Sequence, residues 1–142
     1  RYFNLVGAHQ SGYLGDYPRS NHGSLLSNIF DVVFGKKGKL SIYGNSFPTP
    51  DGTAIRDYID VSDLIEWHIR AYQWAERQKS GKWDVWNLGT WAWASVQEMI
   101  HLTSEITWKP VKTEVIEKRA IDLAIPISDP TKAEVELSWK AN

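Results

Sequence analysis

The residues best suited to chemistry lie between Tyr43 and Leu64 of this chain. Their sequence is YGNSFPTPDGTAIRDYIDVSDL, which is typical of a strand end, a polar Gly- and Pro-rich loop and a short β-prone run into a capped helix. A loop of this composition suits closure over a polar ligand. Arg56 begins the β-prone run, and a guanidinium can meet a diphosphate with a planar, bidentate fork. From these residues alone, an ion pair with Asp57 worth under about 1 kcal/mol is the simpler interpretation.

Metal and nucleophile chemistry find no support in the sequence. The histidines lack the spacing of a metal motif; they are His9, His22, His68 and His101. Four aspartates of the central segment are spread over a loop, a strand and a helix start, so capping and turn roles are favoured over a cation site; they are Asp51, Asp57, Asp60 and Asp63. Ser24 has no accompanying His and Asp pattern. We therefore predict no metal site and no nucleophilic serine.

Composition excludes several other functions. The chain has 142 residues, of which 42% are hydrophobic and 23% charged, as in a globular protein. A net charge of −1 provides no basic field, so we expect no nucleic-acid partner and no binding to an anionic membrane surface. No apolar run approaches the roughly 20 residues of a membrane span. The absence of Cys excludes a disulfide scaffold and fits a reducing compartment.

The order of predicted elements indicates the α/β class. Strands are expected at residues 2–6, 39–43, 58–61, 83–88 and 113–116. Helices are expected from Leu25, from Ser62 or Asp63 as cap, from Ser95, and from the Asp129–Pro130 pair. Ser95 and Glu98 form a capping-box pattern. Polar loops are expected at residues 7–23 and 44–55. Alternation of strands with helices favours an α/β fold without fixing the order of the sheet.

Helical spacing predicts which faces are buried. The second helix would bury Leu64, His68, Tyr72 and Ala75, and the third Met99, Leu102 and Ile106. Trp91 and Trp93 stand in the turn before the third helix, and two interpretations are open for them. They fill a hydrophobic gap, which is slightly favoured, or they form a platform for a sugar or a partner.

Several segments in the same order resemble UDP-glucose 4-epimerases, which belong to the extended short-chain dehydrogenase/reductase family. They are Arg1-Tyr2-Phe3-Asn4 with Gly7-Ala8-His9, Leu40-Ser41-Ile42-Tyr43-Gly44-Asn45, Arg56-Asp57-Tyr58-Ile59, Asn87-Leu88-Gly89-Thr90 with Ser95-Val96, and Asp129-Pro130-Thr131-Lys132-Ala133 with Trp139. The resemblance covers essentially the whole chain. It implies the C-terminal substrate domain of such an enzyme, residues 1–142, with border strands that would join a missing NAD-binding Rossmann sheet.

The resemblance also implies roles for ten residues. It assigns the nucleotide sugar to Asn4, the nicotinamide of NAD to Phe3, the diphosphate to Ser24, Leu25 and Arg56, the uracil to Leu40, Ser41 and Tyr43, and the phosphate and ribose to Arg119 and Asp122. These assignments agree with the chemistry of the side chains, because guanidinium groups pair with phosphates and a carboxylate accepts hydrogen bonds from ribose hydroxyls.

The chain departs from the family pattern at several positions. Gly23 and Ser24 stand where the family has two Asn, and Trp91-Ala92-Trp93 replaces a Gly-x-Gly turn whose residues tolerate positive φ. The family's Arg-x-Gly-Asp reads Arg119-Ala120-Ile121-Asp122, and Pro126 stands where an aromatic residue is frequent. Each of these changes alters a turn or removes a contact beside a predicted ligand residue.

The catalytic parts of the family pattern are absent. The sequence contains no Gly-rich dinucleotide-binding turn, and no Tyr is followed four residues later by Lys. In the family, that Tyr takes a proton from the sugar while NAD takes a hydride. We therefore expect no catalytic residue in this chain and no turnover by the chain alone.

The resulting expectation is a UDP-sugar-binding part of an NAD-dependent isomerase of galactose metabolism. Possible partners are a separate NAD-binding half and, by resemblance, a second copy in a homodimer. The resemblance and the lack of a signal-peptide pattern imply a cytoplasmic location. A non-catalytic interaction module and a degenerate remnant of the epimerase are the alternatives.

Overall fold

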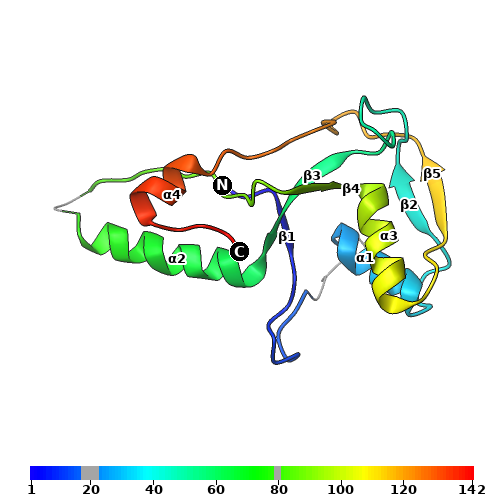
Figure 1. Cartoon of the computed structure of the whole chain (residues 1–142), viewed down its shortest axis with the longest axis horizontal. Coiled ribbons are helices and arrows are strands. Elements are labelled where there is room, and N and C mark those ends of the chain that lie inside the picture. The colour runs from blue at the N-terminus through cyan, green and yellow to red at the C-terminus, as the bar shows by residue number, and fades with distance from the viewer. Residues whose placement is uncertain (17–22, 79–80) are drawn as a thin grey trace. The chain divides into compact units, whose positions relative to one another are not determined.

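The computed structural model describes residues 1–16, 23–78 and 81–142 (Figure 1). Pro18 and His22, which belong to the predicted loop 7–23, lie outside the described residues. The chain divides into two compact units, described separately below. The first unit comprises Arg1–Gly15, Asp57–Trp93 and Ile127–Asn142, and the second comprises Asp16–Arg56 and Ala94–Pro126. The α/β class is confirmed, since strands and helices alternate along the described chain.

The first unit is built on strand β3 and the helix that follows it. Strand β1 (Asn4–Val6) pairs in parallel with β3 (Ile55–Asp60), which continues directly into α2 (Val61–Glu76). The short helix α4 (Thr131–Leu137) packs against α2 (Figure 1). The core between them is mostly aliphatic and tryptophan side chains: Ile59, Leu64, Trp86, Leu88, Ala133, Leu137 and Trp139.

The buried face of α2 differs from the predicted one. Leu64 is buried as expected, but Trp67, Ala71 and Trp74 complete the face, while Tyr72 is 64% exposed. The rings of Trp67 and Trp74 both pack edge-on against Trp86, with centroids 6.1 and 4.9 Å away. Because each indole buries far more apolar area than His or Ala, the two tryptophans determine which way the helix faces.

Two helix starts were also misplaced. Asp60 caps α2 by accepting a hydrogen bond from the Ser62 amide, so neither Ser62 nor Asp63 is the cap. The carboxylate of Asp63 instead accepts bonds from Asn142. At α4 the helix begins at Thr131, one residue after Pro130. The cap of α2 lies two or three residues before the predicted cap, and α4 begins one residue after the predicted start. A local pattern does not determine at which residue the preceding segment ends and the helix begins.

The second unit is a two-stranded parallel sheet covered by two helices. Strand β2 (Leu40–Tyr43) pairs with β5 (Thr113–Ile116), and α1 (Leu25–Val33) and α3 (Val96–Thr107) pack together beside it (Figure 1). Its core contains Ile29, Val33, Leu40, Ile42 and Ile100. The predicted face of α3 is only partly correct: Met99 packs on the core, but Leu102 and Ile106 are 48% and 77% exposed.

The expected strand at residues 83–88 is wrong. The segment is not part of a ladder. It bonds to the chain start at two points: Leu88 N donates to Arg1 O, and the Arg1 amino group donates to Trp86 O. The short strand β4 (Trp93–Ser95) follows and completes the sheet order β1-β3-β4. Within the described residues, no helix is both long and apolar enough to cross a membrane.

The loop that leads into β3 is fixed by Asp51. One carboxylate oxygen accepts bonds from the Thr53 amide and hydroxyl at 2.8 and 2.7 Å, and the other accepts from the Ser95 hydroxyl. Ser95 is also the N-cap of α3 in the predicted capping box with Glu98, which is confirmed. Partial desolvation opposes ionisation, but the hydrogen bonds from Ser95 and Thr53 outweigh it and lower the pKa of Asp51.

Trp108→Gly is expected to stabilise the protein. Trp108 ends α3 in the left-handed conformation, φ 55°, with a side chain that is 93% exposed. Glycine removes the strain of that conformation and loses almost no burial, so the free energy of unfolding should rise by about 1 kcal/mol. Urea unfolding of Trp108→Gly and Trp108→Ala separates the two effects, because Ala removes the ring but keeps the strain. Equal stability of both variants would contradict this explanation.

Ser95→Ala is expected to destabilise the protein by about 1–2 kcal/mol at neutral pH, because it removes a helix cap. The pKa of Asp51 is lower in the folded state than in the unfolded state. The ionised carboxylate therefore contributes to the free energy of unfolding above the unfolded pKa near 3.8, and this contribution is lost as pH falls through the folded pKa. The difference between wild type and Ser95→Ala should therefore narrow below about pH 4. Unfolding curves between pH 2 and 7 test this, with the exposed Ser62→Ala in the first turn of α2 as control. If the difference in the free energy of unfolding between wild type and Ser95→Ala is the same at every pH, the hydrogen bond from Ser95 is not what lowers the pKa of Asp51.

Candidate functional site

Arg56 is held by the main chain of the second unit. Its Nη1 donates to the carbonyls of Ile55 and Leu123 at 2.8 and 2.9 Å, and its side chain is 17% exposed. Strand β3 determines this placement, because its burial alternates and puts Arg56 on the face opposite to its buried neighbours. Both carbonyls accept from Nη1, so an anion would have to approach the guanidinium at Nη2.

Three of the predicted ligand residues come together around Arg56. Asp122 lies 3.7 Å from Arg56 Nη2 and accepts two bonds of 2.9 Å from Arg119 Nε and Nη2. The guanidinium of Arg119 lies over the Tyr43 ring, 4.5 Å from its centroid. We call Tyr43, Arg56, Arg119 and Asp122 the arginine cluster. The hydrogen bonds to the Asp122 carboxylate raise the pKa of Arg119, so this guanidinium stays charged.

The predicted uracil residues lie along β2 with different exposures. Tyr43 is 42% exposed and Ser41 is half-buried, but the Leu40 side chain is 4% exposed within the core. A ligand contact by Leu40 would therefore use its main chain. The Ser41 hydroxyl donates to Glu114 on β5 at 3.2 Å. Sequence reasoning missed Glu114, because its position opposite Ser41 depends on the β2–β5 register, which no local pattern reveals.

Ser24 and Leu25 start the nine-residue helix α1. Ser24 is the N-cap and accepts a bond from the Ser27 amide at 3.2 Å, while its hydroxyl donates to Asp16 at 2.7 Å. The Leu25 side chain packs against the core of the second unit. The main-chain amides of the first turn are the groups that an anion could use here.

Phe3 and Asn4 belong to the first unit. Phe3 is 48% exposed, and Asn4 opens β1 with its Nδ2 donating to the carbonyl of Asp57 at 3.1 Å. A carbonyl can only accept, so the amide group of Asn4 must present its nitrogen to Asp57 and its Oδ1 away from it. Within the described residues, Asn4 Oδ1 and its second N–H have no partner, so both could serve a ligand.

Asp57 has a structural role that the sequence did not reveal. Its side chain is 2% exposed, and its carboxylate accepts bonds from the amides of Thr90 and Ser128 at 3.3 and 3.1 Å. Gly89 lies so close that a Cβ there would clash with this carboxylate. Asp57 is thus neither a cap nor a turn residue. Among the described residues, no three His, Asp or Glu side chains are placed to hold a metal ion.

The described residues do not fit NAD on their own. A dinucleotide pyrophosphate needs an open helix N-terminus after a Gly-rich turn. Strand β3 runs into α2 without such a turn, and the Asp60 carboxylate caps that helix and would repel a phosphate. The start of α3 is filled by its own capping box. Phe3 could contact a nicotinamide only if groups outside residues 1–142 held the rest of the cofactor.

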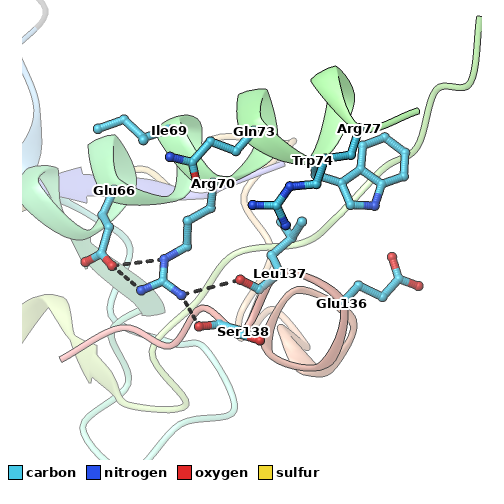
Figure 2. A pocket seen from close by; sticks show the side chains of 9 residues that line it. All are labelled: Glu66, Ile69, Arg70, Gln73, Trp74, Arg77, Glu136, Leu137 and Ser138. Atoms are coloured by element: carbon cyan, nitrogen blue, oxygen red, sulfur yellow. Dashed lines mark hydrogen bonds and ion pairs between the residues drawn. The ribbon is translucent and has the colours of Figure 1, made fainter. Parts of the chain in front are cut away.

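A separate groove lies in the first unit between α2 and α4, with a volume of about 470 Å³ (Figure 2). The side chain of Arg70 extends from α2 towards the end of α4, where it donates to the carbonyls of Leu137 and Ser138. It also donates to Glu66 on α2. None of the ten predicted ligand residues lines it. The bonds of Arg70 to α4 indicate that it joins the two helices.

Comparison with known proteins shows extensive similarity to sugar-nucleotide epimerases. The chain is 40% identical over 141 residues to a UDP-glucose 4-epimerase of Dictyostelium discoideum, covering 99% of this chain and 41% of that protein. It is 40% identical over 144 residues to a probable UDP-arabinose 4-epimerase of Oryza sativa subsp. japonica, covering 99% and 35%. The chain thus spans about two fifths of the relatives that it matches.

Solved structures give the same result. The fold matches a UDP-glucose-4-epimerase from Stenotrophomonas maltophila with bound NAD and formylated UDP-arabinopyranose, with a TM-score of 0.92 and 36% identity over 100% of this chain and 42% of that one. A UDP-glucose 4-epimerase from Bifidobacterium longum in complex with NAD+ and UDP gives a TM-score of 0.91 and 37% identity over the same shares. A family model described as the NAD dependent epimerase/dehydratase family matches residues 1–89. The chain therefore belongs to the NAD dependent epimerase/dehydratase family.

Proposed function

We propose that this chain binds a UDP-sugar as the substrate-binding part of a UDP-glucose 4-epimerase. The observation that carries the proposal is the arginine cluster, in which a main-chain-anchored Arg56 and a second cation, Arg119, surround one carboxylate. Two guanidinium groups suit a diphosphate, which carries two negative charges. The similarity to epimerases supports uridine as the nucleoside.

Each remaining predicted residue has a role in the proposed complex. Asp122 would accept hydrogen bonds from the ribose hydroxyls, and Ser41, Tyr43 and the Leu40 main chain would bind the uracil. Asn4 would contact the sugar through its free Oδ1 and N–H. Ser24 and Leu25 would offer main-chain amides to the diphosphate. These contacts bind the nucleotide and leave the sugar ring free to turn.

In an assembled enzyme the reaction would be inversion at sugar C4. NAD, held by another polypeptide, would supply the hydride chemistry, and this chain would hold the nucleotide while the sugar presents its other face. The chain has no Tyr–Lys pair for the proton transfer, and general acid–base catalysis contributes about 10²–10⁴-fold. We therefore expect no turnover by residues 1–142 alone. Galactose metabolism, a cytoplasmic location and a homodimer stay predictions from the resemblance.

Arg56→Lys should weaken UDP-glucose binding by about 10- to 100-fold. Lysine keeps the charge but cannot pair with two phosphate oxygens through one planar fork, and a hydrogen bond to a charged group contributes about 1.5–3 kcal/mol. Calorimetric titration of UDP-glucose into the purified chain measures the effect. Arg77→Lys is the matched control, because Arg77 lines the groove of the first unit, and none of the predicted ligand residues lines that groove.

The titration also separates the proposed function from its alternatives. Trp91 and Trp93 are 47% and 52% exposed, which does not suit filling a hydrophobic gap and favours a partner-binding surface. Trp91 adopts φ 58°, the conformation for which the family has glycine. A non-catalytic interaction module, or a degenerate remnant, would fold and show no UDP-glucose binding in either wild type or Arg56→Lys. Equal affinity of the two proteins would exclude Arg56 as a ligand residue.

A separate NAD-binding half is the partner that would restore turnover. Strand β1 is an edge strand of a parallel pairing, and sheets of this kind are normally covered on both faces. Tyr2, Phe3 and Leu5 are 47%, 48% and 39% exposed beside that edge. Helix α2 also has an outer apolar stripe, because Ile65, Ile69 and Tyr72 are 55%, 53% and 64% exposed. These surfaces would be buried by such a half.

Mixing the chain with the N-terminal part of a UDP-glucose 4-epimerase, such as the Bacillus subtilis relative, should produce epimerase activity. Ile65→Glu should lower that activity at least about tenfold at limiting concentrations, because burying an apolar side chain contributes about 1.5–3 kcal/mol. Ile106→Glu on α3, which is 77% exposed in the second unit, is the matched control. No activity at any ratio of the two parts would discard the two-chain enzyme.

A further inference from the structure

Asp122 occupies the surface of the arginine cluster that a phosphate would need. Its side chain is only 10% exposed, and both of its oxygens are bound by Arg119 at 2.9 Å. Oδ1 also lies 3.7 Å from Arg56 Nη2. The cluster therefore contains a bidentate ion pair between Arg119 and Asp122, with the second guanidinium beside the same carboxylate.

This arrangement penalises anions that bring no hydrogen-bond donors. A bare diphosphate that binds the Nε–Nη2 edge of Arg119 displaces Asp122 and then lies next to a carboxylate that has lost its partner. A nearly buried carboxylate without a partner costs free energy, and like charges at short range add to that cost. A diphosphate attached to ribose avoids both terms, because the ribose hydroxyls can donate to the freed carboxylate.

We propose that Asp122 is a specificity-determining residue that makes the cluster select nucleoside diphosphates over diphosphates without ribose. The selection comes from a repulsive element, the carboxylate, that only a hydroxyl-bearing ligand can satisfy. The inference rests on the proposed function for its preferred ligand, but the effect on bare anions depends only on the geometry of the cluster. Arg119 is the residue that moves: it is 56% exposed, whereas Arg56 is anchored by two carbonyls.

The test compares inorganic pyrophosphate with UDP on the wild-type chain and on Asp122→Asn. Wild type should bind UDP at least about tenfold more tightly than pyrophosphate. Asp122→Asn should bind pyrophosphate up to about fivefold more tightly than wild type, or about 1 kcal/mol, because the Arg119 side of the ion pair is 56% exposed and solvent weakens such a pair. The same variant should bind UDP more weakly, since an amide is a poorer acceptor for the ribose hydroxyls. The UDP-to-pyrophosphate preference should therefore fall about tenfold or more.

Asp84→Asn is the matched control for charge. Asp84 is also paired with a cation, Lys132, but belongs to the first unit. Asp84→Asn should therefore leave the affinities for UDP and for pyrophosphate unchanged. Thermal melting verifies that each variant is folded. If Asp122→Asn does not fold, ¹⁵N-detected arginine side-chain spectra of the wild type replace it. Pyrophosphate should then shift the Nε–H resonance of Arg119 more than that of Arg56.

The outcomes separate this inference from the proposed function. If pyrophosphate binds equally to wild type and Asp122→Asn, or binds to neither, the proposed selection by Asp122 is overturned. An Arg119 resonance that pyrophosphate does not shift overturns it as well. If the wild-type chain binds no UDP-glucose but Asp122→Asn binds pyrophosphate more tightly than wild type, the selection by Asp122 is supported and the proposed UDP-sugar function is rejected. If wild type binds UDP and Asp122→Asn has the same preference for UDP over pyrophosphate, the proposed function stands and the selection by Asp122 is rejected.

Discussion

The buried carboxylate of Asp57 is the interaction on which the first unit depends. It receives main-chain amides from two segments far away in sequence, at Thr90 and Ser128, and Gly89 must lack a side chain to let it fit. Without that carboxylate each buried amide would lose its partner, at about 1–3 kcal/mol apiece. The carbonyl of the same residue orients the Asn4 amide. One residue of β3 therefore holds three segments together and fixes the direction of a proposed sugar contact.

The alternation of β3 links this structural role to the arginine cluster. Ile55, Asp57 and Ile59 are buried, so the intervening Arg56 must face the other way. A slip of one residue in the strand would bury the guanidinium and expose the Asp57 carboxylate. Both errors would cost free energy, since a buried charge requires a partner. The placement of Arg56 thus follows from the need to bury its neighbours and does not require any contact of its own.

The sequence predicts local features well and tertiary choices poorly. The Ser95–Glu98 capping box is correct because it involves residues three apart in one helix. The face of α2 is wrong because Trp67 and Trp74 choose it through contacts with the distant Trp86. Glu114 was missed for the same reason, since its contact with Ser41 needs the β2–β5 register. Of the predicted ligand residues, the structure brings four together in the arginine cluster, and a helical or strand period could not have revealed that grouping.

Charge balance within the arginine cluster determines what the proposed binding site requires of its ligand. Arg56 and Arg119 supply two positive charges against one on Asp122, so the ligand-free cluster keeps one positive charge beside a partly desolvated surface. Under the proposed function, a UDP-sugar brings two negative charges and hydroxyl donors, which neutralises both arginines and satisfies the carboxylate together. Under the same proposal, proton transfer and hydride transfer would need other groups. The proposed recognition of the nucleotide is therefore separable from chemistry on the sugar, because the contacts of this cluster all come from residues 43–123.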